Sequence, residues 1–305
     1  MTIATGRVGM LGLGRMGLPI AQALVTSGFE VSAWDPLPER RSLATEASVA
    51  VAASADAVAR GAPILVTVLP GPTEFRDAVV GGGLLALLAE GGLWLDLTSN
   101  DPQVLDEVDA LGRSAGVVGV AAPMAGGPTA AEARGLRFFV GAEDDALERV
   151  RPILEVLGGN EAIEHIGPGI ADGCTAKLLT NLLWFGQVVA VTEALLLGVS
   201  LGVPLQSLRR SLAGGAGGSV FIDDYLDALV GGDNLATFGI DRVVEELDTL
   251  VRLARRQDVP FELGERVAQL HRDALTRFGA IDGELLAARL LEERAGITLR
   301  ESPQQ

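Results

Sequence analysis

The sequence predicts an α/β protein with an N-terminal doubly wound parallel sheet, one long helix and an all-α C-terminal region. Three observations support this prediction. Short apolar runs alternate with helical stretches through the first half of the chain, as in parallel sheets covered by helices. A helical pattern with few charges then runs from Gly167 to Pro204. After Pro204 the strand pattern stops and only helical segments follow.

Length, charge and cysteine content restrict the class of protein. A chain of 305 residues is long for one domain, so we expect a domain at 1–166, a second at 167–298 and a disordered tail at 299–305. The formal net charge of −16 argues against a nucleic-acid or anionic-membrane partner. The single cysteine, Cys174, excludes intrachain disulfides and fits a reducing cytoplasm.

The first strand and helix carry a glycine motif. The apolar run 7–13 leads into it, the helical pattern 18–28 follows, and a second strand-like run, 29–35, comes next. The first glycine allows the tight turn, the second lets a pyrophosphate approach the backbone, and the third lets helix and strand pack closely. This context predicts a Rossmann domain that binds a dinucleotide at the helix N-terminus. The motif is Gly12-Leu13-Gly14-Arg15-Met16-Gly17.

The second strand-like run ends in Asp35, eighteen residues after the last glycine of the motif. An acid at this position accepts hydrogen bonds from the adenosine ribose and repels a 2′-phosphate, which favours NAD over NADP. Arg40 and Arg41 follow closely, so NADP stays open.

The alternation continues with strand-like runs at 63–70, 93–98, 117–123, 136–142 and 161–167. Helical stretches at 40–48, 73–89, 103–115 and 144–157 separate them. Ligands of such sheets bind at the carboxyl ends of the strands, so we expect the loops at 69–72, 98–102 and 123–128 to contact them. In the last loop, Gly126-Gly127 either presents backbone N–H groups to an anion or forms an ordinary turn.

His165 and His271 are the only histidines. Neither has Cys, Asp or Glu neighbours at metal-ligand spacing, so we expect no metal and no catalytic triad. Both are interpreted as structural or surface residues.

The long helical pattern carries Gly173, Lys177 and Asn181 at spacing i, i+4, i+8, which places them on one face. The alternative is a lysine at the helix boundary with its amine in water. The stretch 178–204 could span a membrane by length, yet Asn181, Gln187 and Glu193 recur along it. We therefore expect a helix buried between domains or subunits, in a homodimer or homotetramer.

Together these residues resemble the β-hydroxyacid dehydrogenases, which include the 3-hydroxyisobutyrate, tartronate-semialdehyde and 6-phosphogluconate enzymes. The resemblance covers Gly9 to about Ala295. The family's G-L-G-x-M-G is at 12–17, and D-x-S-T-x-x-P appears as Asp96-Leu97-Thr98-Ser99-Asn100-Asp101-Pro102. The family's G-x-x-x-K-x-x-x-N is Gly173, Lys177 and Asn181.

The chain departs from the family at two places. The substrate loop D-A-P-V-S-G-G is Ala121-Ala122-Pro123-Met124-Ala125-Gly126-Gly127 here, so Ala125 replaces the serine that helps hold a carboxylate. A Lys-Asp pair counted from Phe238 falls on Glu245-Glu246.

The resemblance implies a hydride transfer between NAD(P) and a small hydroxy acid. Lys177 is then the general acid or base, Asn181 orients the substrate oxygen, and Leu69, Pro70 and Ser99 lie at the cofactor. The substrate would lie against Ala125, Gly126, Gly127 and Gly173. Two alternatives stay open: an imine reductase, which the acids at 245–246 favour and Lys177 opposes, and an NAD(P)-binding sensor without catalysis.

Overall fold

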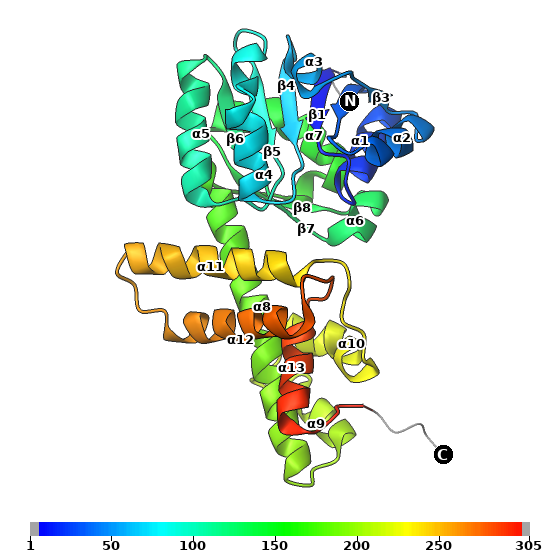
Figure 1. Ribbon diagram of the computed structural model, residues 1–305, viewed down its shortest axis with the longest axis vertical. Helices are drawn as coiled ribbons and strands as arrows, with labels where there is room; N and C mark the ends of the chain where they lie inside the picture. The colour runs from blue at the N-terminus through cyan, green and yellow to red at the C-terminus, as the bar shows by residue number, and fades with distance from the viewer. Residues whose placement is uncertain (1–5, 301–305) are drawn as a thin grey trace. The chain divides into compact units, whose positions relative to one another are not determined.

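The computed structural model describes residues 6–300 and divides the chain into two compact units (Figure 1). The first unit ends at Lys177 and the second begins at Leu178. The first holds a parallel-dominated sheet covered by helices and the second is all helical, which confirms the predicted fold class.

The sheet of the first unit follows the order β3-β2-β1-β4-β5-β6-β8-β7, with β9 paired to β8. From β3 to β6 all neighbours are parallel. The order reverses between β1 and β4, which is where open sheets of this kind bind ligands. The six parallel strands are β1 Arg7–Leu11, β2 Glu30–Trp34, β3 Ala50–Val51, β4 Ile64–Thr67, β5 Leu93–Asp96 and β6 Val118–Ala121.

Beyond β6 the sheet turns antiparallel, which the sequence pattern did not reveal. β8 (Arg137–Gly141) runs against β6 and also against β7 (Met124–Ala125), and β9 (Ile163–Gly167) is parallel to β8. Between β6 and β7, Pro123 has no N–H to donate, but its carbonyl accepts from Phe139 N at 3.1 Å. β6 and β7 therefore continue one pairing register along β8.

Helices cover both faces of the sheet, so strand side chains on both faces are apolar. On β1, Val8 and Met10 belong to the core that α1 and α7 cover, whereas Leu11 packs on the opposite side with Val58 of α3. The expected helix 73–89 is broken at Gly81–Gly83 into α4, a π-helical segment and a 3₁₀ turn. The helices are α1 Gly17–Thr26, α2 Pro38–Glu46, α3 Ala55–Ala59, α4 Pro72–Arg76, α5 Pro102–Ser114, α6 Gly127–Ala133 and α7 Asp144–Gly158.

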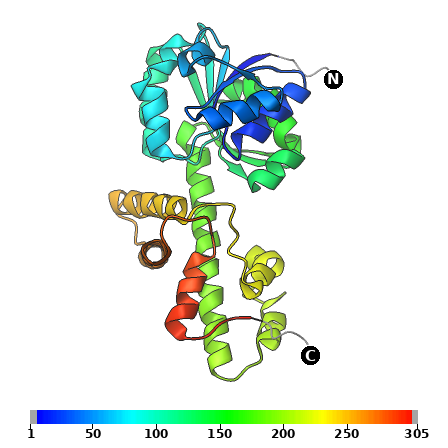
Figure 2. The same cartoon turned by 45° about the vertical axis from the view of Figure 1, so that its right-hand side comes forward.

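The second unit is built on α8 (Ile170–Ser200), beside which α13 runs (Figures 1 and 2). By length and composition alone α8 could cross a membrane. Its side chains Phe185, Val188 and Leu195 are buried in one core with α11, α12 and α13, which makes it the core helix of this unit. The other helices are α9 Leu205–Leu212, α10 Leu226–Gly231, α11 Ile240–Arg256, α12 Glu262–Phe278 and α13 Leu286–Ala295, with a π-helical segment at Phe221–Tyr225.

Two boundaries differ from those expected. The first turns of α8 pack with the sheet, so the first unit extends to Lys177 instead of ending at 166. Leu299 and Arg300, assigned above to a disordered tail, are ordered: Leu299 is buried, and its N–H donates to Glu292 Oε1 at 2.6 Å. Arg300 Nη1 donates to the same oxygen at 2.9 Å. Residues 301–305 of that tail lie outside the described residues.

Candidate cofactor and catalytic site

The glycine turn after β1 has the shape that a dinucleotide requires. A Cβ at Gly12 (φ 94°) would come within 3.0 Å of Val68 O, and one at Gly17 within 3.0 Å of Gly12 O, so both positions exclude a side chain. A Cβ at Gly14 would meet nothing within 4 Å. At the N-terminus of α1, all of whose residues the structure describes, no side chain accepts a capping hydrogen bond. The first turn of the helix contains no acidic residue. The turn therefore leaves room for a pyrophosphate at Gly14 and at the helix N-terminus, where an anion is favoured.

Asp35 follows β2 directly, is buried, and holds the glycine turn through a hydrogen bond to its backbone. Its Oδ2 accepts from Leu13 N at 2.8 Å, and its Oδ1 accepts from Leu37 N at 2.9 Å. Arg41 donates from Nη1 to the carbonyls of Asp35 (2.6 Å) and Pro36 (2.9 Å), and its guanidinium lies over the Trp34 ring. The carboxylate thus lies beside the glycine turn, where the adenosine ribose of a bound dinucleotide is expected.

The loops after β4 and β5 are tied together. Leu69 N donates to Thr98 Oγ1 at 3.1 Å, which fixes the Leu69-Pro70 loop against the loop that carries Ser99. Ser99 itself is half-buried. The predicted cofactor contacts Leu69, Pro70 and Ser99 thus belong to one connected edge of the sheet.

Beneath these loops lies a buried carboxylate, Asp96, at the end of β5. Oδ1 accepts from Thr67 Oγ1 at 2.7 Å and from Thr98 N at 3.2 Å, and Oδ2 accepts from Asn100 Nδ2 at 3.0 Å. Burial raises the pKa of Asp96 to about 6, while the hydrogen bonds from Thr67, Asn100 and Thr98 act in the opposite direction. Asp96 is the first residue of the motif at 96–102, but the motif alone indicates no role for its carboxylate.

The beginning of α8 is anchored to the same network. Cys174 Sγ donates to Asn100 O at 2.6 Å. A Cβ at Gly173 would come within 3.0 Å of Phe139 O on β8, so the space left by this glycine is occupied by backbone. The glycine at 173 therefore lets α8 approach the sheet, and the predicted substrate contact at this residue stays a prediction.

Lys177 follows Cys174 by one turn and is 9% exposed. This excludes the alternative of a boundary lysine with its amine in water. It is also the only lysine in the chain, since the other basic residues counted with it are arginines. Arginine stays protonated in proteins, whereas a lysine amine can exchange its proton, so among the lysine and arginine side chains only Lys177 is suited to proton transfer.

On the second unit, Asn181 Nδ2 donates to Glu246 Oε2 at 2.6 Å, and Glu246 is buried. This bond sets the orientation of the Asn181 amide. The neighbouring Glu245 pairs with Arg242 at 2.9 Å. The two acids that replace the family's Lys-Asp pair therefore have different roles, one holding Asn181 and the other an arginine.

The glycine pair of the third loop forms the turn into α6. Ala125 pairs with Arg137 in the sheet, Gly126 (φ 120°) precedes the helix, and Gly127 (φ 67°) begins it. The positive φ angles explain why both residues are glycines. The turn interpretation thus has a direct structural reason, and the anion interpretation stays a prediction.

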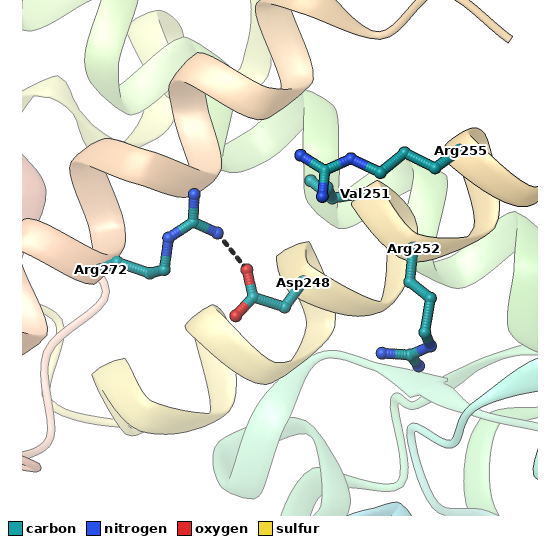
Figure 3. A pocket seen from close by; sticks show the side chains of 5 residues that line it. All are labelled: Asp248, Val251, Arg252, Arg255 and Arg272. Carbon is teal, nitrogen blue, oxygen red and sulfur yellow. Dashed lines mark hydrogen bonds and ion pairs between the residues drawn. The ribbon is translucent and has the colours of Figure 1, made fainter.

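A hollow of about 360 Å³ lies in the second unit between α11 and α12 (Figure 3). Its lining includes Arg252, Arg255 and Arg272, the last of which pairs with Asp248. None of the predicted site residues lines it. Among residues 6–300, no group of three or more His, Cys, Asp or Glu side chains could hold a metal ion.

The fold and this site define an NAD(P)-binding oxidoreductase. Residues 7–167 match the family described as the NAD-binding domain of 6-phosphogluconate dehydrogenase. Residues 171–291 match the family described as NAD-binding of NADP-dependent 3-hydroxyisobutyrate dehydrogenase. The chain belongs to the β-hydroxyacid dehydrogenase family.

Relatives agree with this assignment. The chain is 35% identical over 210 residues to a probable 3-hydroxyisobutyrate dehydrogenase of Mycobacterium tuberculosis, covering 69% of this chain and 70% of the relative. It is 31% identical to the NAD-dependent L-serine dehydrogenase of Pseudomonas aeruginosa, covering 72% and 73%. A solved structure of Mycobacterium tuberculosis 3-hydroxyisobutyrate dehydrogenase with L-serine matches at TM-score 0.85 and 28% identity, covering 94% and 99%.

Proposed function

We propose that the chain transfers a hydride between NAD and a small β-hydroxy acid, with Lys177 as the proton donor or acceptor. The observation that carries this proposal is that the only lysine of the chain is buried on α8, one turn from the thiol that binds the Ser99 loop. The named relatives act on 3-hydroxyisobutyrate or L-serine, so these two compounds are the first candidates.

The chain's residues have separate tasks in this proposal. In the oxidising direction the neutral Lys177 amine accepts the hydroxyl proton as the carbon loses its hydride, and in the reducing direction the ammonium returns that proton. Bound NAD supplies the hydride acceptor. Asn181, its amide oriented by Glu246, holds the substrate oxygen. Ala125 offers no hydroxyl, so the Gly126 and Gly127 amides bind the carboxylate.

The preference for NAD rests on two side chains. The Asp35 carboxylate would repel a 2′-phosphate at the end of β2. Arg41, one of the two arginines that could attract such a phosphate, donates instead to the Asp35 and Pro36 carbonyls.

The unit that acts is proposed to be a homodimer or homotetramer in a reducing cytoplasm. On α8 the exposed leucines Leu179, Leu183 and Leu197 lie on one face, and Leu201, which follows the helix directly, is 74% exposed. Such a row favours contact with a second copy. Light scattering coupled to size-exclusion chromatography would reveal the assembly, and Leu183→Glu with Leu197→Glu should shift it toward the monomer.

The catalytic proposal is tested with Lys177→Ala and Lys177→Arg. We expect both variants to bind NADH within about threefold of the wild type, while kcat for L-serine or 3-hydroxyisobutyrate falls by roughly 100- to 10,000-fold. Arginine keeps the charge but cannot accept a proton, so it separates charge from proton transfer. Equal turnover by Lys177→Arg would refute the role of Lys177. Turnover of a cyclic imine by the wild type, without hydroxy-acid oxidation, would instead favour an imine reductase.

A further inference from the structure

The buried carboxylate of Asp96 connects three parts of the first unit that the proposed site needs. Through Thr98, whose hydroxyl accepts from Leu69 N, it reaches the loop after β4. Through Asn100 it reaches α8, because Asn100 O accepts from Cys174 Sγ. Asp96 itself lies at the end of β5, fully buried, and does not reach the surface where a ligand would bind.

Only an acceptor fits at position 96, because every neighbour is a donor. Trp94 Nε1 donates to Thr67 Oγ1 at 3.0 Å, so the Thr67 hydroxyl hydrogen points to Asp96. Asn100 Oδ1 accepts from Asp101 N at 2.9 Å, which directs the Asn100 Nδ2 hydrogens to Asp96. The third contact is the backbone N–H of Thr98. An ionised carboxylate satisfies all three donors, and a neutral amide at 96 would set an N–H group against one of them.

We propose that Asp96 is a positioning residue that holds the Ser99 loop and the beginning of α8 together, and through them the place of Lys177. The chain of contacts is Asp96, Asn100, Cys174 and then one helical turn to Lys177. The titratable side chains of this network besides Asp96 are Asp101, which caps α5 by accepting from Gln103 N at 2.9 Å, and the Cys174 thiol. The kinetic part of the argument rests on the proposed function, and the structural part does not.

The claim that Asp96 holds the Ser99 loop and the beginning of α8 together can be tested by the reactivity of Cys174. This residue is the only thiol in the chain and is fully buried. The measurement is the rate at which native protein without cofactor reacts with an aromatic disulfide at pH 8. Asp96→Asn should raise this rate by roughly tenfold or more, since opening free energies of local contacts set the exposure of buried groups. The matched control is Asp109→Asn, a buried acid on α5 that pairs with Arg113 and lies outside the network. We expect this control to react within about twofold of the wild type.

The kinetic part uses the same two variants. Displacing the loop and the lysine by about 1 Å should lower kcat roughly 10- to 100-fold in Asp96→Asn, while NADH affinity changes less than about threefold. Unchanged thiol reactivity and unchanged kcat in a folded Asp96→Asn protein would overturn the inference. If the wild type oxidises no hydroxy acid, the proposed function fails, and thiol reactivity still decides the role of Asp96.

A second pair of variants covers the case in which Asp96→Asn does not fold. Cys174→Ser keeps a donor toward Asn100 O and should retain kcat within about twofold, whereas Cys174→Ala loses the donor and should lower kcat several-fold. The serine variant therefore keeps the hydrogen bond to Asn100 O, and with it the kcat, that the alanine variant loses. Equal kcat in the two variants would overturn the positioning of Lys177 through Asn100.

Discussion

Gly14 and Gly17 are three residues apart in one motif, yet an alanine at Gly14 should weaken cofactor binding, whereas an alanine at Gly17 should lower the stability of the fold. A Cβ at Gly14 meets nothing within 4 Å, so the folded protein without cofactor accommodates it. A Cβ at Gly17 would come within 3.0 Å of Gly12 O, a backbone atom that cannot rotate away. Gly14→Ala should therefore impair binding alone, and Gly17→Ala should impair folding.

The expected magnitudes follow from these contacts. Gly17→Ala forces α1 away from β1 and should lower the free energy of unfolding of the first unit by about 1–3 kcal/mol, the usual cost of overpacking. Gly14→Ala should change that free energy by less than about 0.5 kcal/mol, as surface substitutions do. Its methyl group would occupy the path of the pyrophosphate, so NADH should bind at least about tenfold more weakly, or about 1.4 kcal/mol.

Both quantities can be measured by tryptophan fluorescence. In a Trp184→Phe background the remaining tryptophans, Trp34 and Trp94, both belong to the first unit. Quenching by NADH then gives the dissociation constant, and urea titration gives the free energy of unfolding of that unit alone. Normal NADH binding by Gly14→Ala would refute the assignment of the glycine turn. A stable Gly17→Ala protein would refute the packing argument.

Three further perturbations test other parts of the molecule. Asp35→Asn removes the charge at the end of β2 and should narrow the NADH-over-NADPH preference by roughly tenfold or more, read from the same quenching titration. His271 is buried, and burial lowers its pKa to about 4, so the unfolded chain binds more protons between pH 4 and 6.5 and stability is lost as pH falls through that window. Wild-type unfolding free energy should fall by about 2 kcal/mol from pH 7 to pH 5 on account of this residue, and His271→Leu should lack that part of the decline. Arg300→Ala should destabilise the second unit by about 1–3 kcal/mol, because it removes a donor from the buried Glu292 carboxylate, and a thermal melt that matches the wild type would contradict this.

The parts of the fold that the sequence predicts are those with strong local patterns. The glycine turn, the acid at the end of β2 and the alternation of strands and helices all have signals within a few residues. The antiparallel direction of β8 has none, because an apolar run of five residues reads the same in either direction. The break of helix 73–89 did have a signal, Gly81-Gly82-Gly83, which the apolar residues on either side obscured.

In the site, too, the features with a local sequence signal could be predicted and those that depend on distant residues could not. The residues of the motifs could be located, but the role of Asp96 depends on partners such as Thr67 and Cys174, 29 and 78 positions away in the sequence. Gly173 was assigned to the substrate because it belongs to the family's G-x-x-x-K-x-x-x-N motif, which also places it on one helix face with Lys177. Its actual neighbour is the β8 backbone, which no spacing within α8 could reveal.

The contact between Glu292 and the residues at 299–300 has a consequence for the order in which the chain acquires structure during synthesis. The first unit is complete once Lys177 has left the ribosome, so it can fold while the rest is still being made. α13 alone satisfies the Glu292 carboxylate only in part: Arg289 pairs with it from within the helix, whereas Leu299 N and Arg300 Nη1 can donate to it only after residues 299–300 have emerged. Until then the apolar face of α8 lacks its completed cover, and this interval is when a nascent chain most needs protection from aggregation.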